Sequence, residues 1–299
     1  MICPKCGLEQ QDDVECIQCG IIFEKYRNPA ETVRHPSVMT ESRPRCSRVS
    51  MPWNALLRLT LLISIGLFAI SYLLKDNLPD GGDILEELLQ HPVQREVDMA
   101  PFEIEAGEIV YTITPLYTYE LYGMVVSHHN CGTWWDIYHH DQWKDFINVK
   151  DLCVIWGNNL QTEVYKDMRF TSDSWTCTYY WPNHEVGSRF DYTRLSNNHL
   201  LSHDESVTKA LLKTESGDQI YLRGYLAEYS HSNMDFLRGT STNRTDTGNG
   251  ACETIYVEDY QILKIGNPFW RMTFTISKYV ILGSLALLII RFFRSTVAS

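Results

Sequence analysis

The chain has 299 residues, which is enough for one large domain or two small ones. Its formal net charge is −11, and acidic residues exceed basic ones most strongly between residues 59 and 270. Neutralising nucleic-acid phosphates requires clustered Lys and Arg, so this balance argues against nucleic acid as a partner of that part of the chain.

Two CxxC pairs stand near the N-terminus, where residues 3–19 read CPKCGLEQQDDVECIQC and contain Cys3, Cys6, Cys16 and Cys19. Each CxxC places two thiolates on one tight turn, and a glycine follows each pair where the backbone needs room. Four sulfurs predict a closed, structural Zn²⁺ site, whereas a redox site would need one pair rather than two. Because a module of this size has almost no hydrophobic core, we expect the metal to supply its folding energy. Its reduced thiolates predict a reducing compartment, the cytoplasm.

The second half of this stretch reads ECIQCGIIFEKY. Residues 1–27 thereby resemble the short zinc ribbon at the N-terminus of many bacterial membrane proteins, in which CPxCG is followed by an acidic spacer. The resemblance implies Zn²⁺ and a bacterial setting but no activity, because such ribbons are fused to varied partners. Lys5, Lys25 and Arg27 stand against five acidic residues, which favours protein contact or a folding role over DNA binding.

Residues 28–54 are rich in Pro, Ser, Thr and Arg and show no apolar periodicity, which predicts a flexible basic linker. We expect its arginines to lie against the anionic inner leaflet of a membrane. Cys46 is a lone thiol in this linker. It is either an incidental residue, the favoured interpretation, or a site of palmitoylation.

Two apolar runs predict transmembrane helices over residues 55–74 and 271–294, followed by a short tail at 295–299. A signal peptide is the alternative for the first run, but it would follow a short basic start rather than a folded segment. The second run is interrupted by Lys278, so a buried or amphipathic C-terminal helix is its alternative.

The charges beside the two runs predict their orientation. Arginines precede the first run and follow the second, whereas five acidic residues follow the first within residues 76–87. By the positive-inside rule, both termini are expected in the cytoplasm and residues 75–270 on the periplasmic or extracellular side of the inner membrane.

Residues 75–270 are predicted to form a mainly β domain, a small barrel or sandwich with one or two helices. Helices are expected at residues 143–149 and 206–214. Strand-like segments rich in Tyr, Val, Ile and Trp occur at residues 107–114, 119–127, 151–157, 174–181, 218–229 and 252–263.

This domain contains four cysteines, an even number that predicts two disulfides in an oxidising compartment, with three possible connectivities. Cys153 and Cys177 each lie centrally in a predicted strand, so neighbouring strands would bring them together. That pairing leaves Cys131 with Cys252. Buried free thiols are the alternative.

Two histidine-containing stretches are candidate sites. HHNCGTWWDIYHHD, residues 128–141, has the composition of a metal site. It lacks helical spacing, however, and adjacent histidines on a strand point to opposite faces, which favours a solvated surface loop. In LSNNHLLSHDES, residues 195–206, His199 is a candidate general base, and a packed, hydrogen-bonded histidine is equally consistent.

The third candidate is GTSTNRTDTGNGACE, residues 239–253. Arg244 offers a fork for an anion and Asp246 would orient it, which predicts a ligand-binding or structural loop. Cys252 becomes a candidate nucleophile if His199 or His231 comes within reach. The TGNG segment lacks the downstream lysine and helix of a phosphate-binding loop.

The segments NNHLL, GDQIYLRGYL and GTSTNRTDTGNGACETIYV resemble those of bacterial membrane proteins to which no activity is attached. The leading hypothesis is a two-span membrane protein that joins a cytoplasmic zinc ribbon to an outward β domain. That domain would bind a ligand or a protein partner, or assemble with a second copy. The alternatives are a thiol-dependent hydrolase or transferase using Cys252 and His199, and a scaffold subunit of a membrane assembly.

Overall fold

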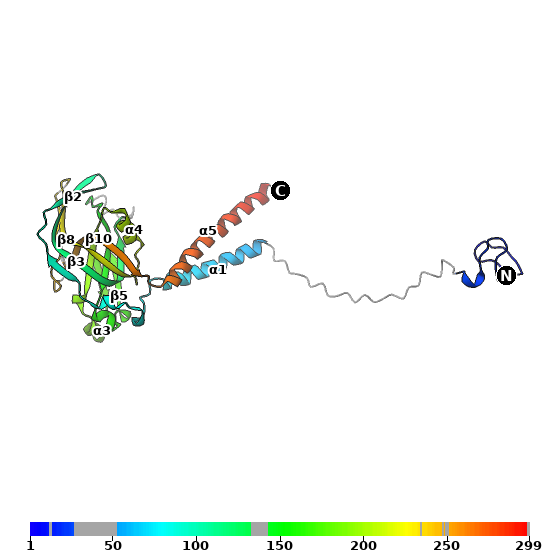
Figure 1. Cartoon of the computed structure of the whole chain (residues 1–299), viewed down its shortest axis with the longest axis horizontal. Coiled ribbons are helices and arrows are strands. Elements are labelled where there is room, and N and C mark those ends of the chain that lie inside the picture. The colour runs from blue at the N-terminus through cyan, green and yellow to red at the C-terminus, as the bar shows by residue number, and fades with distance from the viewer. Residues whose placement is uncertain are drawn as a thin grey trace. The chain divides into compact units, whose positions relative to one another are not determined.

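The computed structural model of the chain describes residues 1–11, 14–26, 53–132, 143–233, 235–246, 248 and 251–297 (Figure 1). These residues belong to two compact units, Met1–Met51 and Pro52–Ser299. The predicted linker, with its Cys46, lies outside the described residues up to residue 52.

The first unit contains two short loops of the same construction, each closed around one CxxC pair. The N–H of Gly7 donates to Cys3 O at 2.9 Å, and the N–H of Gly20 donates to Cys16 O at 2.8 Å. Both glycines have positive φ, 76° and 67°, a region that residues with a side chain rarely adopt. The need for a glycine after each pair is thus confirmed. A 3₁₀ turn, η1 (Phe23–Lys25), follows the second loop.

The central part of the second unit is built mainly from β-strands, with few helices, which confirms the predicted mainly β class. We refer to residues 75–267 as the β domain. Its strands are β1 (Val93–Glu96), β2 (Phe102–Ala106), β3 (Ile109–Asn130), β4 (Asn148–Ile155), β5 (Arg169–Asp173), β6 (Thr176–Tyr180), β7 (Leu195–Leu201), β8 (Gln219–His231), β9 (Phe236–Arg238) and β10 (Glu253–Lys264).

The pairings of five long strands form a closed circle. β3 is a single strand of 22 residues that contains both of the first two predicted strand segments. It pairs with β4 and also with β8. From β4 the pairing continues to β7, β10 and β8, and so returns to β3. Only the β7–β10 pair of this circle is parallel. Outside the circle, β1 and β2 each pair with β3, and β9 pairs with β8, all antiparallel.

β4 is buried at every position because both of its faces are covered. Successive side chains of a strand point to opposite faces. Leu152 and Val154 pack in a core shared by the five circle strands. Cys153 and Ile155 pack on the outer face, under the β5–β6 hairpin and its neighbouring short helices. The hairpin therefore encloses the outer face of β4, where polar side chains would otherwise meet water.

One of the two predicted helices is present. The helix α4 (Glu205–Lys213) links β7 to β8, and Asp204 caps it by accepting from the N–H of Ser206 and Val207. The helix predicted at residues 143–149 is wrong, since residues 143–147 are not helical and the next residues begin β4. Its short apolar run packs into the β core, and such a run does not distinguish a helix from a strand.

Short helical turns connect the strands of the β domain. They are η2 (Gly81–Asp83), η3 (Glu86–Leu89), α2 (Asn158–Gln161), η5 (Val164–Asp167), α3 (His184–Arg189) and η6 (Tyr192–Arg194).

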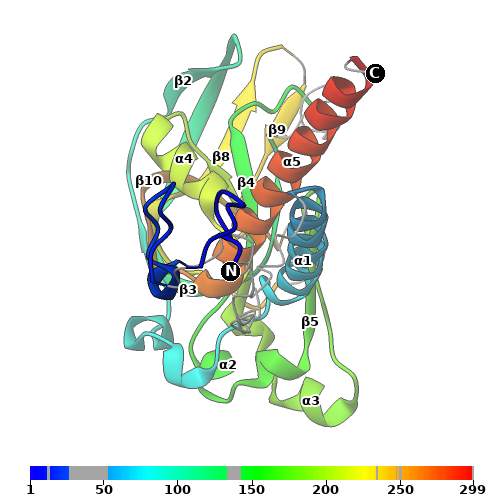
Figure 2. The same cartoon turned by 90° about the vertical axis from the view of Figure 1, so that its right-hand side faces the viewer.

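Two helices, α1 (Trp53–Leu74) and α5 (Pro268–Val297), are long and apolar enough to cross a membrane. They lie side by side (Figures 1 and 2), with rings of Phe68 and Phe274 stacked at 4.8 Å. Arg291 Nε, near the end of α5, donates to Asn54 Oδ1 at the start of α1, so the pair is antiparallel. Small residues at the seam allow this close approach. The buried residues are Ser64, Ser71, Ser277 and Ser284.

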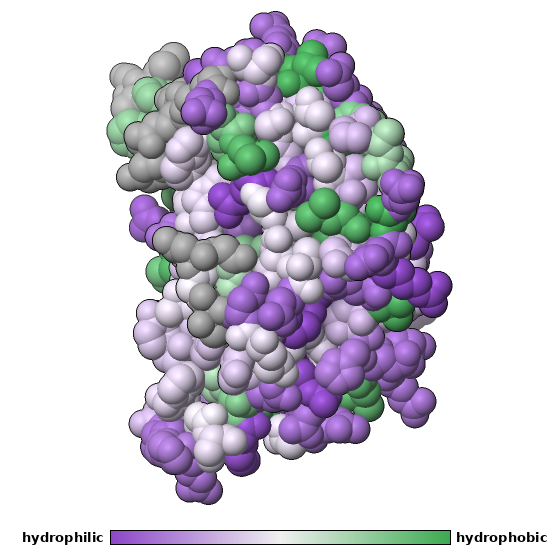
Figure 3. All heavy atoms as spheres, turned by 90° about the vertical axis from the view of Figure 1, so that its left-hand side faces the viewer, coloured by the Kyte–Doolittle hydropathy of each residue, from purple (hydrophilic) through white to green (hydrophobic). Residues whose placement is uncertain are grey.

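The β domain and the two long helices differ in surface character. Most large apolar side chains of α1 and α5 are exposed, Leu62 by 67% and Ile276 by 53%. The face of the β domain in Figure 3 is hydrophilic over most of its area, with isolated hydrophobic residues. The helices thus carry an apolar surface suited to lipid, whereas this face of the domain suits water.

Candidate functional site

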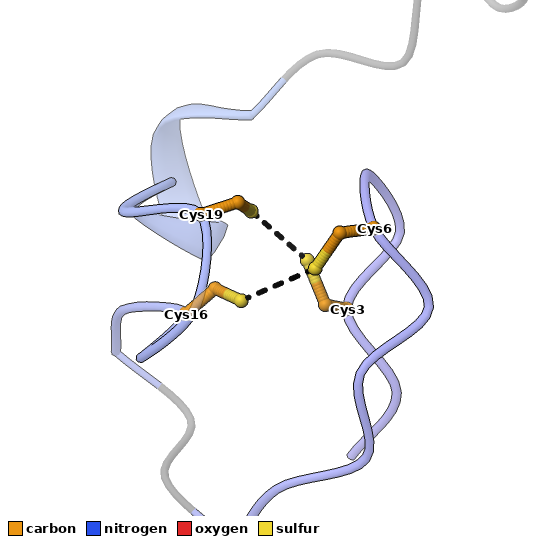
Figure 4. A group of neighbouring side chains, drawn as sticks. All are labelled: Cys3, Cys6, Cys16 and Cys19. Atoms are coloured by element: carbon orange, nitrogen blue, oxygen red, sulfur yellow. Dashed lines mark hydrogen bonds between the residues drawn. The ribbon is translucent and has the colours of Figure 1, made fainter.

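The four N-terminal cysteines converge on one point (Figure 4). The Sγ atoms of Cys3, Cys6, Cys16 and Cys19 all lie within 4.8 Å of one another. The Cys3–Cys19 and Cys6–Cys16 sulfurs are 3.6 Å apart. A tetrahedral centre with metal–sulfur bonds of about 2.3 Å separates its sulfurs by roughly 3.8 Å. The four cysteines can therefore hold a metal ion, as predicted for these residues.

Gln10 joins the two cysteine loops behind this site. Its Nε2 donates to Glu15 O at 2.7 Å, and its Oε1 accepts from the N–H of Ile17 at 3.0 Å. The side chain is only 8% exposed. Both of its ends are therefore used to fix the second loop, and this orients two of the four sulfurs.

A buried Asp–His pair lies on the outer face of β4 and β7. The strand register places Asp151 directly opposite His199. Asp151 Oδ1 is 2.7 Å from His199 Nδ1, and both side chains are 0% exposed. Asp151 also accepts from Asn148 Nδ2 at 3.1 Å and from the backbone N–H of Trp175 at 3.2 Å. The carboxylate thus accepts the Nδ1 proton of His199 and fixes the orientation of the ring.

Cys252 lies against this pair as a half-buried free thiol, one residue before β10. Asn197 Nδ2 donates to Cys252 Sγ at 3.3 Å and to Trp175 O at 2.9 Å. The Cys252 thiol donates to Trp175 O at 3.8 Å, and its sulfur is among the groups that act on His199. The structure therefore brings together the two residues that the thiol hypothesis required.

Arg238 contacts the same histidine from another direction. Its Nη2 is 2.9 Å from His199 Nε2, and its Cζ lies 3.4 Å from the centre of the Trp175 ring. Burial alone lowers the pKa of His199, but the Asp151 carboxylate and the neighbouring Cys252 raise it to about 9, against the charge of Arg238. A guanidinium only donates, so its contact with Nε2 uses the lone pair that a proton would take. Arg238 and a proton therefore compete for Nε2.

Arg244 is bound by Glu253 and not by Asp246, which corrects the sequence expectation. Its Nη1 donates to Glu253 Oε1, and its Nη2 donates to the Tyr119 hydroxyl at 2.6 Å. Asp246 Oδ2 instead accepts from the Ser241 hydroxyl at 2.7 Å. Burial raises the pKa of Glu253 to about 7 although Arg244 opposes this. Arg244 pairs with Glu253 because this carboxylate is 3% exposed and has lost the water that still solvates Asp246.

A groove of about 710 Å³ joins these residues. Tyr179 and Tyr192 add aromatic surface to it. Among the residues that the structure describes, the buried atoms Asn197 Oδ1 and Glu253 Oε2 have no hydrogen-bond partner. Such unpaired acceptors are costly, by about 1–3 kcal/mol each. The groove wall includes Trp175, Asn197, Arg238, Arg244, Cys252 and Glu253.

One of the two predicted disulfides is formed. Cys153 of β4 and Cys177 of β6 are bonded, with their Cα atoms 5.7 Å apart. The other predicted pair is wrong, because Cys131 and Cys252 are not bonded to each other. Cys131 is buried at the end of β3 near Lys150, whereas Cys252 lies in the groove wall. Cys131 was assigned to Cys252 because these two cysteines remained after the first pair, which assumed that every cysteine of the domain forms a disulfide.

The histidine-rich stretch does not assemble a metal site among its described residues. His128 Nε2 lies 3.1 Å from Glu215 Oε2 and lowers the pKa of that carboxyl. His139, His140 and Asp141 lie outside the described residues. His203 does not join His199, since its Nδ1 bonds the Tyr256 hydroxyl at 2.7 Å. His199 and His203 are four positions apart, which would place them on one face of a helix, but His199 lies in the strand β7.

Several residues of this site escaped the sequence analysis. Asp151 and Asn197 are polar residues at buried strand positions, and that contrast was an available signal. Trp175 and Arg238 carried no comparable signal. They reach the site because Trp175 lies in the turn between β5 and β6 and Arg238 ends β9.

No protein-family model matches the chain, and neither curated proteins nor solved structures show significant similarity to it.

Proposed function

We propose that the chain is a two-span protein of the bacterial inner membrane whose outward β domain binds a ligand in the groove. Both termini lie in the cytoplasm, and residues 75–270 lie outside. The antiparallel packing of α1 and α5 supports this topology because it puts both ends of the chain on one side. The basic flanks of the spans support the direction.

The cysteines support the same sidedness. Free thiols at Cys3, Cys6, Cys16 and Cys19 suit a reducing compartment, whereas the bond of Cys153 in the β domain suits an oxidising one. The span α1 separates the two regions. The metal proposed for the N-terminal site is Zn²⁺, since four thiolates in closed tetrahedral reach are its usual structural ligands.

For the β domain, we interpret the circle of five strands as a small closed barrel. In five-stranded Greek-key barrels, ligands bind on the face of the second and third strands and on the loop between the fourth and fifth. The corresponding elements here are β4, β7 and the segment between β8 and β10, and of these β7 and the β8–β10 segment line the groove, together with β6. This support is an analogy of fold, which alone does not establish function.

The observation that carries the binding proposal is the groove itself. Its volume of about 710 Å³ is within the range of ligand pockets. Arg238 and Arg244 provide donors, while Asn197 and Glu253 hold acceptors that lack a partner among the described residues. We therefore expect a polar ligand that carries both N–H donors and carbonyl or carboxylate acceptors. A short peptide-like amide has both. The predicted protein partners and self-association stay predictions.

The test is binding of N-acetyl dipeptide amides to the full-length protein in lipid nanodiscs, measured by saturation-transfer NMR. At least one member of a panel with varied side chains should bind with a Kd below about 1 mM. Asn197→Ala should weaken that binding about tenfold, the worth of one hydrogen bond to an otherwise unpaired group. Asn158→Ala, on α2 and outside the groove wall, is the matched control and should bind like the wild type.

Two results would overturn the binding proposal. One is that no member of the panel binds to the folded protein. The other is that Asn158→Ala and Asn197→Ala weaken binding equally, which would place the ligand elsewhere.

A further inference from the structure

We propose that Cys252 is a nucleophile for acyl transfer, with His199 as its base and Asp151 as the residue that positions the base. The proposal rests on the proposed function, because the substrate is the ligand of the groove. The acyl donor is an ester, thioester or activated amide of a peptide-like compound.

The order of the three residues is that required of an activated nucleophile. In the resting arrangement the thiol donates to Trp175 O at 3.8 Å and the sulfur lies beside the imidazole, whose Nδ1 is 2.7 Å from a buried carboxylate. In such an arrangement the base takes the proton of the nucleophile, and the carboxylate holds the ring and stabilises its cationic form. Asp151 and His199 are 0% exposed, whereas Cys252 is half-buried in the groove wall. Of these three residues, only Cys252 therefore lines the groove while Arg238 covers His199 Nε2.

Asn197 supplies a donor at the point where negative charge would develop. Its Nδ2 is 3.3 Å from the Cys252 sulfur and is held by Trp175 O on the other side. An acyl carbon bonded to the sulfur would carry its oxygen close to this amide. Side-chain amides serve as oxyanion donors in acyl-transfer sites.

Arg238 blocks the base in the resting arrangement. His199 Nε2 has one lone pair, and Arg238 Nη2 occupies it at 2.9 Å while the Cys252 thiol donates to Trp175 O. Proton transfer from the thiol follows once the guanidinium has left Nε2. Arg238 itself lines the groove, so an acceptor group on a bound ligand can attract it away.

The reaction then balances without any further cofactor. The proton of Cys252 passes to His199 Nε2 as the sulfur bonds to the acyl carbon. The tetrahedral intermediate expels its leaving group, which takes the proton from the imidazolium, and a thioester remains. Water or an amine then attacks the thioester, with His199 again accepting the proton, and the thiol is restored.

Cys131 provides an internal comparison within the β domain. It is fully buried and is not part of the groove wall. Burial in apolar surroundings makes a thiol unreactive. Selective reaction of Cys252 over Cys131 is therefore the first expectation.

The experiment treats the full-length protein in nanodiscs with p-nitrophenyl acetate and locates acetyl groups by mass spectrometry. Cys252 should be acetylated in the wild type. His199→Gln should slow this at least about 100-fold, the usual range for loss of a general base. Asp151→Asn should slow it too and shift the pH of half-maximal rate by about one unit or more, a change that a merely structural role would not cause.

Dipeptide-amide binding separates this proposal from the binding proposal and also verifies folding. Cys252→Ala should lose the acetylation, whereas Asn158→Ala, outside the groove wall, should keep both the amide binding and the acetylation. A wild type that binds the amide but shows no acetylation of Cys252, or the same rate in a folded His199→Gln variant, would overturn the thiol proposal and leave the binding proposal intact. Loss of amide binding in the wild type would overturn both.

Discussion

The four-cysteine unit, residues 1–26, and the groove of the β domain both gather reactive side chains, but over very different lengths of chain. Cys3 and Cys19, at the two ends of the metal site, are 16 positions apart. In the groove, Asn197 and Cys252 are 55 positions apart, and Trp175 and Cys252 are 77 apart. The first site is made by two tight turns, and the second by the register of a sheet.

This difference determines how each site fails. The four-cysteine unit has almost no core, so its structure depends on its ligand. The groove belongs to a domain with a large core, so loss of a groove residue should leave most of the fold in place. Substitutions in the two regions should therefore differ in how much stability they remove and in how much of the structure is lost.

Metal removal is expected to have the largest effect. Apparent binding free energies of structural zinc in small modules are about 10–16 kcal/mol. The full-length protein should contain about one zinc per chain. Cys16→Ser or a chelator should release it and make residues 1–26 sensitive to protease, while the thermal transition of the β domain stays unchanged.

The control for this prediction is Glu24→Ala, an exposed change in the same unit. It should keep the metal and the resistance to protease. If the β domain lost stability together with the metal, the independence of the two regions would be wrong.

Breaking the buried Asp–His pair should have the next largest effect. Asp151→Ala leaves His199 buried without its carboxylate and removes the acceptor of the Trp175 N–H. The free energy of unfolding should fall by about 3–5 kcal/mol. Asp246→Ala removes an exposed carboxylate and should change stability by less than about 0.5 kcal/mol. Thermal unfolding of the two variants in nanodiscs measures the contrast, and equal losses would contradict it.

The disulfide should contribute somewhat less. It closes a loop between residues separated by 24 positions, for which chain entropy predicts about 3 kcal/mol of stability. Cys153→Ala combined with Cys177→Ala should lower the free energy of unfolding by that amount, and reduction of the wild type should have the same effect. Non-reducing peptide mapping that found Cys131 bonded to Cys252 would contradict the pairing.

The smallest expected effect is a pH dependence that originates at Glu253. Its pKa, ordinarily near 4.5, is raised by burial to about 7 in the folded chain. The folded state therefore holds this proton more tightly, and the resulting stability is fully present below pH 4.5 and lost as the pH rises through 7. The change is at most about 3 kcal/mol.

Glu253→Gln cannot ionise and should flatten this part of the stability–pH curve. Unfolding temperatures of the wild type and the variant, measured between pH 4 and about 8, test this. Parallel curves for the two proteins would show that another group is responsible.

Much of the fold and part of the site could be predicted from the sequence. The two CxxC pairs, the glycines behind them and the two apolar runs are local patterns, and local patterns depend on few neighbours. The hydrophobic alternation also predicted most long strands. It missed β7, because Asn197 and Asn198 interrupt its apolar pattern, although both side chains are buried in the folded domain.

The contacts between the residues of the groove could not be predicted from the sequence. Cys252 and His199 were selected by their residue types, but Asp151 was not, because nothing near it in the chain indicates that it faces a histidine. Arg244 was expected to pair with Asp246, two positions away, and pairs instead with Glu253, nine positions away. Nearness in sequence was a poor guide, because burial decides which carboxylate keeps the arginine.

By itself, the sequence determined the four-thiolate ligand set, two helices of membrane-spanning length and a mainly β domain between them. The closed order of the strands, the single disulfide, the free thiol beside His199 and the partner of Arg244 were decided only by the tertiary structure. The physical reason is the range of the interactions. Turn geometry and hydrophobic length act between near neighbours, whereas strand register and burial join residues that the chain itself keeps far apart.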